Sequence, residues 1–105
     1  MRVLVTGHHG YLGSVLMPLL AARGHDAVGL DTNLFERCIL GGEPVPGAWR
    51  SLATDLRDVT RGDLEGFDAV LHLAGLSNDP LGDLDPDLTV RINLEGSLLL
   101  AQLAK

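Results

Sequence analysis

The segment Thr6–Gly13 constrains the fold of this chain more than any other part of its sequence. It follows a short apolar run, Val3–Val5, and precedes a stretch in which apolar residues recur at helical spacing. Gly7 permits a tight turn out of a strand, Gly10 leaves no side chain where a diphosphate approaches the backbone, and Gly13 lets the helix pack closely on the sheet. The amides that begin such a helix attract phosphate. The alternative is a glycine-rich turn that serves packing alone.

Strand and helix signals alternate along the rest of the chain. Short apolar runs bounded by turn residues predict strands, and longer runs of helical periodicity predict helices. Pro18 is a misfit inside the first helix, and Gly24 is the expected stop of that helix. Residues 32–50, rich in glycine and proline, predict a long loop with a helical turn near Phe35. The expected strands are Arg2–Thr6, Ala27–Leu30, Trp49–Ala53 and Ala69–Leu73, and the expected helices are Tyr11–Arg23, Asp58–Leu64 and Pro86–Ala104.

This alternation predicts an α/β fold. Strands separated by helices or long loops form a parallel sheet with right-handed crossovers, here about four strands in the order 3-2-1-4. That order is the N-terminal half of a Rossmann-type, doubly wound sheet. The length of 105 residues suits one small domain, so we expect a single dinucleotide-binding domain over residues 1–105, truncated before a fifth strand.

Asp31 indicates which dinucleotide the glycine segment would hold. It ends the second predicted strand, 18 positions after Gly13, where a carboxylate accepts hydrogen bonds from both hydroxyls of the adenosine ribose. A 2′-phosphate there would meet a like charge, which costs several kcal/mol. NAD is therefore favoured over NADP. Arg37 would offset the charge of the 2′-phosphate only if the loop after Asp31 folded back. A role for Asp31 as a turn former is the alternative.

Four motifs, in the expected order over essentially the whole chain, resemble the extended short-chain dehydrogenase/reductase family. Within it they resemble the NAD-dependent sugar-nucleotide epimerases and dehydratases. Thr6–Gly13 has the spacing Thr-Gly-x-x-Gly-x-x-Gly, and Asp55–Leu56 matches the pair that contacts adenine. His72–Gly75 resembles a His-Leu-Ala-Ala segment, and Asn93–Gly96 resembles the Asn-x-x-Gly of the following helix.

The resemblance implies a cofactor site. Asn33 would lie beside the adenosine, Asp55 would accept from the adenine amino group, and Leu56 would cover the ring. Leu76 and Ser77 would lie toward the nicotinamide and the substrate. The cofactor-binding residues implied are Gly7, Gly10, Tyr11, Leu12, Gly13, Asp31, Asn33, Asp55, Leu56, Leu73, Ala74, Gly75 and Asn93.

Plainer structural roles stay open for three of these positions. Asp55 would equally cap the turn at Asp58. Asn93 would equally satisfy buried backbone groups, and Ser77 suits a turn as well as a contact.

The histidines give no sign of a metal site. His8 and His9 replace the small residues often found in the phosphate loop, and we expect them to point into solvent rather than to bond a phosphate. His72 is most simply a residue at a strand end, because no cluster of His, Cys or carboxylates has metal-ligand spacing. The acidic residues from Asp79 to Asp87 suit a solvated loop and a helix cap.

The catalytic residues that the resemblance implies are absent from these 105 residues. Hydride chemistry in the family rests on a Tyr-x-x-x-Lys pair. Here the single tyrosine, Tyr11, is followed four positions later by Val15, and the single lysine is Lys105. The resemblance therefore implies the NAD(H)-binding portion of an oxidoreductase that acts on nucleotide sugars, catalytically incomplete as given. A non-catalytic NAD-binding module or redox sensor is the alternative, and an S-adenosylmethionine-binding fold fits the glycines less well.

Charge and cysteine content bear on partners and location. A net charge of −6 disfavours nucleic acid and anionic membranes as partners. A single cysteine, Cys38, excludes an intrachain disulfide and suits a reducing compartment. No run is long enough to span a bilayer, so we expect a cytoplasmic protein.

The last predicted helix is apolar on two faces. One face would cover the sheet, and the other would need a partner. A corresponding helix forms dimers in the family that the chain resembles, so we expect a homo-oligomer through this helix. One of the two faces carries Leu88, Ile92, Leu99 and Leu103, and the other carries Val90, Leu94, Leu98 and Ala101.

Overall fold

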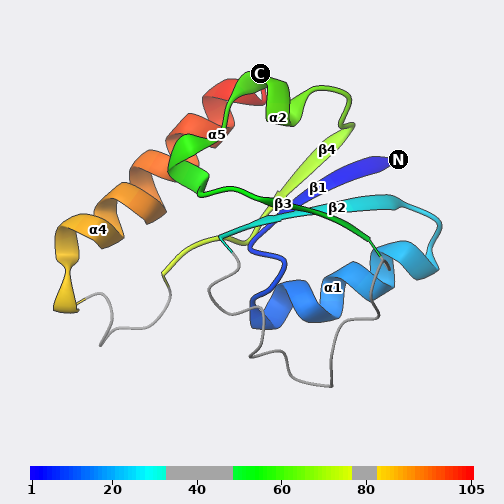
Figure 1. The fold of residues 1–105 in the computed structure, drawn as a ribbon, viewed down its shortest axis with the longest axis horizontal. Coiled ribbons are helices and arrows are strands. Elements are labelled where there is room, and N and C mark those ends of the chain that lie inside the picture. Colours follow the sequence, from blue (N-terminus) through cyan, green and yellow to red (C-terminus); the bar gives the residue numbers. More distant parts are fainter. Residues whose placement is uncertain (33–48, 77–82) are drawn as a thin grey trace.

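A computed structural model describes residues 1–32, 49–76 and 83–105. These residues form a four-stranded sheet with helices on both faces (Figure 1). Every strand pair is parallel and the order is β3-β2-β1-β4, as the sequence predicts. The expected helical turn near Phe35 lies outside the described residues. The strands are β1 (Arg2–Thr6), β2 (Asp26–Asp31), β3 (Arg50–Ala53) and β4 (Ala69–His72).

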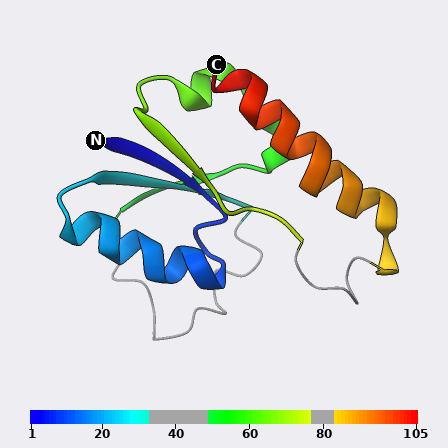
Figure 2. The same cartoon turned by 180° about the vertical axis from the view of Figure 1, so that it is seen from behind.

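The helices divide between the two faces of the sheet. α1 lies alone on one face among the described residues, and α2, α4 and α5 lie on the other (Figures 1 and 2). A short 3-10 turn, η1, and a π-helical segment, η2, complete the described elements. The bounds are α1 (Tyr11–Ala22), η1 (Leu56–Asp58), α2 (Arg61–Leu64), α4 (Pro86–Val90), η2 (Arg91–Gly96) and α5 (Ser97–Leu103).

Successive side chains of a strand point to opposite faces of the sheet, so each strand contributes to the core on both faces. Along β1, Val3 and Val5 pack with Met17 of α1, whereas Leu4 packs with Leu100 of α5. Each fully buried aliphatic side chain of this kind stabilises the fold by about 1.5–3 kcal/mol. Because both faces are covered, β1 and β2 are nearly continuous apolar runs, which is typical of parallel sheets.

α1 matches its predicted range to within one residue and continues through Pro18. The proline removes one backbone donor, but Leu16 and Leu20 pack against the sheet on both sides of it and hold the helix in place. The helix stops as predicted at Gly24, which has a φ of +78°. Three other apolar residues of the helical pattern face outward and are exposed, namely Leu12, Val15 and Leu19.

The C-terminal helix differs from the expected single α-helix over Pro86–Ala104. Its start is as predicted, because Asp85 Oδ1 accepts a hydrogen bond of 2.9 Å from the amide of Leu88. Its middle is the π-helical segment η2, which apolar periodicity does not reveal. At the end of η2, a Cβ on Gly96 would lie 2.9 Å from Leu56, so a glycine allows the helix to approach η1 closely.

The expected helix over Asp58–Leu64 is also different. The chain forms η1 and then the single turn α2, which Thr60 and Asp63 cap reciprocally. Among the described residues, no helix combines the length and apolar character needed to cross a membrane.

Candidate functional site

A cleft opens at the carboxyl ends of β1, β2 and β4. In open α/β sheets, ligands bind at this end, where the strand order changes direction between β1 and β4. The cleft has a volume of about 300 Å³ and mostly apolar walls. Its lining residues are Gly7, Gly10, Leu30, Asp31, Thr32, Thr54, Asp55, Leu56, Arg57, Leu73, Ala74, Gly75, Leu76, Leu88 and Ile92.

The glycine loop lies at the floor of this cleft, and its shape depends on missing side chains. Gly7 has a φ of +71°, and a Cβ there would lie 2.8 Å from the Cα and N of Ala74. A Cβ on Gly13 would lie 2.4 Å from the Cα of His8. Gly13 therefore lets α1 pack onto the backbone of the loop itself, which differs from the predicted close contact with the sheet.

The N-terminus of α1 begins beside the cleft. Gly10 is the N-cap residue, and no described side chain caps the helix there. Gly10 lines the cleft, whereas Tyr11, Leu12 and Gly13 are not among its lining residues, and the side chains of Tyr11 and Leu12 are exposed. Uncapped amides at a helix N-terminus form a positive end that binds anions.

His8 contradicts the expectation that it points into solvent. It is 3% exposed, and its ring covers Gly29 so closely that a Cβ there would lie 2.2 Å from the ring. Nε2 is 2.8 Å from the hydroxyl of Ser51 on β3. Because Gly29 has no side chain, the imidazole of His8 packs directly on its backbone. The contact with Ser51 then links the glycine loop to β3 across β2. The ring of His9 stacks at a tilt 4.0 Å from that of His8.

Asp31 stands at the end of β2, inside the cleft. Its Oδ2 accepts a hydrogen bond of 3.2 Å from the amide of His9. The carboxylate is thus held beside the glycine loop, one strand over from β1, as the sequence predicts.

Asp55 has the capping role that was considered from sequence, and its contact with adenine stays a prediction. It caps η1, with Oδ1 accepting from the amide of Arg57 at 2.9 Å, and it lines the cleft. The Arg57 guanidinium donates to both of its oxygens, Nε to Oδ1 at 3.0 Å and Nη2 to Oδ2 at 2.7 Å. These side-chain hydrogen bonds hold the pKa of the Asp55 carboxyl below its usual value.

The segment Leu73–Leu76 after β4 forms another wall. Leu73, Ala74 and Gly75 line the cleft, whereas Asn93 stands behind them. Asn93 Oδ1 accepts from the Leu76 amide at 2.7 Å, and Nδ2 donates to the Leu76 carbonyl at 2.8 Å. The Asn93 side chain therefore satisfies the backbone of Leu76, which was the plainer of its two expected roles.

Comparison with known proteins decides the family. A sequence profile described as "NAD dependent epimerase/dehydratase family" matches residues 3–105. The chain belongs to this family.

Individual relatives agree with this assignment. The chain is 32% identical over 113 aligned positions to a UDP-glucose 4-epimerase of Mycolicibacterium smegmatis, covering 100% of this chain and 35% of the relative. An epimerase structure from Methanothermobacter thermautotrophicus superposes with a TM-score of 0.83 at 30% identity, covering 98% of this chain and 31% of that one. The UDP-glucose 4-epimerase of Thermus thermophilus, solved in complex with NAD, gives 0.79 at 34% identity, with coverages of 98% and 33%. The chain spans about a third of the length of the relatives it matches.

Several lining residues of this epimerase/dehydratase family member were not predicted from sequence. Thr32 and Thr54 immediately follow β2 and β3, and the position after a parallel strand is the signal that would have found them. Arg57 follows Asp55 by two positions, and the turn η1 brings it to the cleft. Asn33 and Ser77, two other predicted positions, lie outside the described residues.

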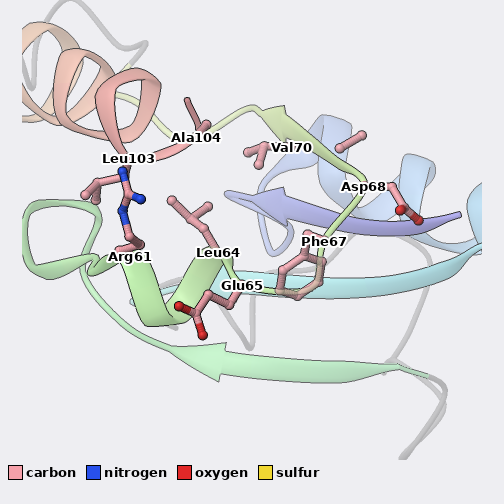
Figure 3. A pocket seen from close by; sticks show the side chains of 9 residues that line it. Arg61, Leu64, Glu65, Phe67, Asp68, Val70, Leu103 and Ala104 are labelled. Carbon is pink, nitrogen blue, oxygen red and sulfur yellow. The ribbon is translucent and has the colours of Figure 1, made fainter.

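A second hollow, of about 490 Å³, lies at the opposite end of the sheet. Figure 3 shows Leu64 of α2 between Val70 of β4 and Leu103 of α5, with Asp68 at the start of the strand. Although this hollow is larger, it lies at the amino ends of the strands, beside the outer edge of β4. The glycine loop and Asp31 line the other end of the sheet, so the smaller cleft is the candidate site. Among the described residues, no three His, Cys, Asp or Glu gather to hold a metal.

Proposed function

We propose that this chain binds NAD(H) in the cleft at the carboxyl end of its sheet. The observation that carries the proposal is the N-terminus of α1, which has no side-chain cap and begins beside Gly7 and Gly10, two residues that line the cleft. The diphosphate would lie against Gly7 and Gly10 and accept hydrogen bonds from the amides of Tyr11, Leu12 and Gly13. The proposed NAD-binding Rossmann domain comprises residues 1–105.

Asp31 would hold the adenosine ribose. Its place at the end of β2, tied to the amide of His9, directs the carboxylate to the side of the diphosphate where that sugar lies. A 2′-phosphate would bring a second negative charge to the same place, which supports NAD rather than NADP.

The adenine would pack on Leu56 and bond to Asp55. A carboxylate oxygen accepts two hydrogen bonds, and the described contacts with Arg57 use both positions on Oδ1 and one on Oδ2. The second position on Oδ2 suits the amino group of adenine. Asn33 would lie beside the adenosine.

The opposite wall would receive the nicotinamide half. Leu73, Ala74 and Gly75 would contact it through backbone and small groups, with Asn93 bracing the segment from behind. Bound NAD supplies a hydride acceptor and donor. In a complete protein the substrate would be a nucleotide sugar, as the names of the UDP-glucose 4-epimerase relatives suggest.

The alternative proposal is a non-catalytic NAD-binding module or redox sensor, because the Tyr-x-x-x-Lys pair is missing from these 105 residues. A Tyr-x-x-x-Lys pair downstream in the parent reading frame would favour the enzyme. A stop codon directly after Lys105 would favour the sensor.

Calorimetric titration with NAD and NADP tests the cofactor proposal. We expect the chain to bind NAD at least roughly tenfold more tightly than NADP, and Asp31→Asn to abolish this preference, because a charge-assisted bond to a hydroxyl contributes about 1.5–3 kcal/mol. Asp26→Asn is the matched control, since Asp26 begins the same strand at the opposite end. Equal binding of both dinucleotides to the unaltered chain would refute the role of Asp31.

Self-association and location complete the proposal. Val90, Leu94 and Leu98 are 49%, 55% and 54% exposed along one side of the C-terminal helix, which supports a homo-oligomer through this surface. In sedimentation velocity, Leu94→Glu should convert a dimer to a monomer, and Val15→Glu on α1 should not. A monomeric unaltered chain would contradict this.

A cytoplasmic location fits the single cysteine.

A further inference from the structure

His72 joins three elements that are far apart in the sequence. It ends β4, its Nδ1 lies 2.7 Å from the hydroxyl oxygen of Thr6 on β1, and its Nε2 lies 2.8 Å from the hydroxyl oxygen of Ser97 on α5. No metal and no substrate contact is needed to account for this arrangement, and the proposed NAD site does not include the residue.

The neighbouring bonds determine where the proton on this imidazole lies. Ser97 Oγ is 2.6 Å from the carbonyl oxygen of Asn93, which can only accept, so the serine hydrogen is donated there. Ser97 must then accept from Nε2–H of His72. A ring that carries its proton on Nε2 and is neutral has a bare Nδ1 that accepts.

The other side of the ring gives the same assignment independently. Thr6 Oγ1 accepts from the Ala74 amide at 3.2 Å and from the Leu73 amide at 3.2 Å, and the Leu73 amide also donates to the Thr6 carbonyl oxygen at 3.1 Å. The two amides occupy the two lone pairs of Oγ1. Its own hydrogen is then left for Nδ1 of His72. Both sides therefore require the neutral ring with hydrogen on Nε2.

This chain of bonds holds both ends of the segment Leu73–Leu76. The Leu73 amide is shared between the carbonyl and hydroxyl oxygens of Thr6, and the Ala74 amide is held by the hydroxyl, which His72 orients. The last residue is held by Asn93, whose carbonyl receives the hydrogen of Ser97. The segment packs against Gly7 and lines the proposed cofactor cleft.

We propose that His72 is a positioning residue that, as the neutral Nε2–H ring, orders the cofactor-lining segment Leu73–Leu76 through Thr6 and Ser97. Protonation of His72 to its cation would disrupt these hydrogen bonds. With hydrogens on both nitrogens, the ring would become a third donor to Thr6 Oγ1, and one of the two amide bonds would be lost. The effect on cofactor binding rests on the proposed NAD function, and the state of the ring does not.

The surroundings of the ring are uncharged. From β1 and α5 it meets the hydroxyls of Thr6 and Ser97, and from β4 its own strand. The charged side chains on the packed elements are Arg2 at the far end of β1, which pairs with Asp26, and Arg91 and Glu95 on η2, both exposed. His72 is an exposed residue, and partial desolvation of its ring lowers its pKa and so favours the neutral form.

Nitrogen-15 NMR of the labelled, unaltered chain tests the ring state without any variant. At pH 7.5 we expect His72 to show a protonated Nε2 and a bare Nδ1 in long-range ¹H–¹⁵N spectra, with His25 as an internal reference. A protonated Nδ1, or fast averaging between the two tautomers, would overturn the proposal.

Conservative variants separate positioning from general stability. His72→Asn keeps an acceptor near Thr6, His72→Gln keeps a donor near Ser97, and His72→Leu keeps neither. We expect hydrogen exchange of the Ala74 and Leu76 amides to be fastest in His72→Leu. Relative to that variant, His72→Asn should slow exchange at Ala74, and His72→Gln should slow it at Leu76. Equal exchange in all four chains would overturn the proposal.

NAD titration links this order to binding. At pH 7.5, His72→Leu should weaken NAD binding roughly tenfold, as expected for the loss of about two hydrogen bonds. On acidification, affinity should fall in the unaltered chain and stay level in His72→Asn. Parallel pH profiles would overturn the link. If the unaltered chain binds no NAD, the proposed function fails, while the tautomer and exchange results still decide the positioning role.

Discussion

The two loops that line the cleft are held in place by opposite means. The loop after β1 depends on absent side chains, since a Cβ on Gly7 or Gly13 would lie 2.8 or 2.4 Å from neighbouring backbone. The segment Leu73–Leu76 after β4 depends on side chains that are present, because Thr6 and Asn93 bond its backbone groups. The first arrangement is mainly steric, supplemented by the contact of His8 with Ser51 and by the hydrogen bond from the His9 amide to Asp31. The second is a directed set of hydrogen bonds that a single proton disturbs.

The largest effect should come from Gly7→Ala, with Gly24→Ala as its control. Both glycines have positive φ, +71° and +78°, but nothing lies within 4 Å of a Cβ on Gly24. Gly24→Ala should lower the free energy of unfolding by about 1–2 kcal/mol, which is the backbone cost alone. Gly7→Ala should lower it by about 1–3 kcal/mol more, because the methyl group overlaps Ala74. Equal losses in urea denaturation would show that the contact with Ala74 is not tight.

A smaller effect is expected at Gly29, because the ring of His8, from the loop after β1, packs directly against it. Gly29→Ala places a methyl group against the ring of His8, and overpacking of this kind costs about 1–3 kcal/mol. His8→Ala should remove most of that cost, so the double variant should unfold at higher urea than the sum of the single effects predicts. Additive losses in this double-mutant cycle would mean that the ring does not pack on Gly29.

The smallest effect should be the pH dependence that His72 adds. Partial desolvation lowers its pKa from 6.5, so the unfolded chain binds more protons than the folded chain between pH 6.5 and the lower, folded value. The contribution of this residue to stability is complete above pH 6.5 and is lost as pH falls through that window. Urea midpoints of the unaltered chain should therefore drop more steeply below pH 6.5 than those of His72→Asn. Identical slopes would contradict the claim that hydrogen bonds of neutral His72 hold the segment Leu73–Leu76 in place.

The steric region was largely predictable from sequence. Glycine spacing after an apolar run implies a turn, and Asp31 at the next strand end implies a carboxylate nearby, because parallel strands end at the same edge. The order of the strands followed from the same alternation. What spacing does not contain is the partner of a side chain, so His8 was expected in solvent although it packs on Gly29, 21 positions away.

The polar region was predictable only in outline. The resemblance pointed to His72–Gly75 and Asn93, but Thr6 and Ser97 bond His72 across separations of 66 and 25 residues. No local pattern encodes such pairs. The π-helical segment Arg91–Gly96 was hidden for a related reason. Its apolar residues continue a helical period, so periodicity does not distinguish it from an α-helix, and the segment packs against η1, which is distant in sequence.

Chemical-shift mapping of the ¹⁵N-labelled chain with NAD tests most directly whether bare backbone at the start of α1 holds a dinucleotide. The account predicts that the largest amide shifts fall on Gly10, Tyr11 and Leu12, that adenosine alone shifts them much less, and that pyrophosphate competes for them. Shifts centred instead on Leu64, Phe67 and Val70, around the hollow at the other end of the sheet, would contradict it.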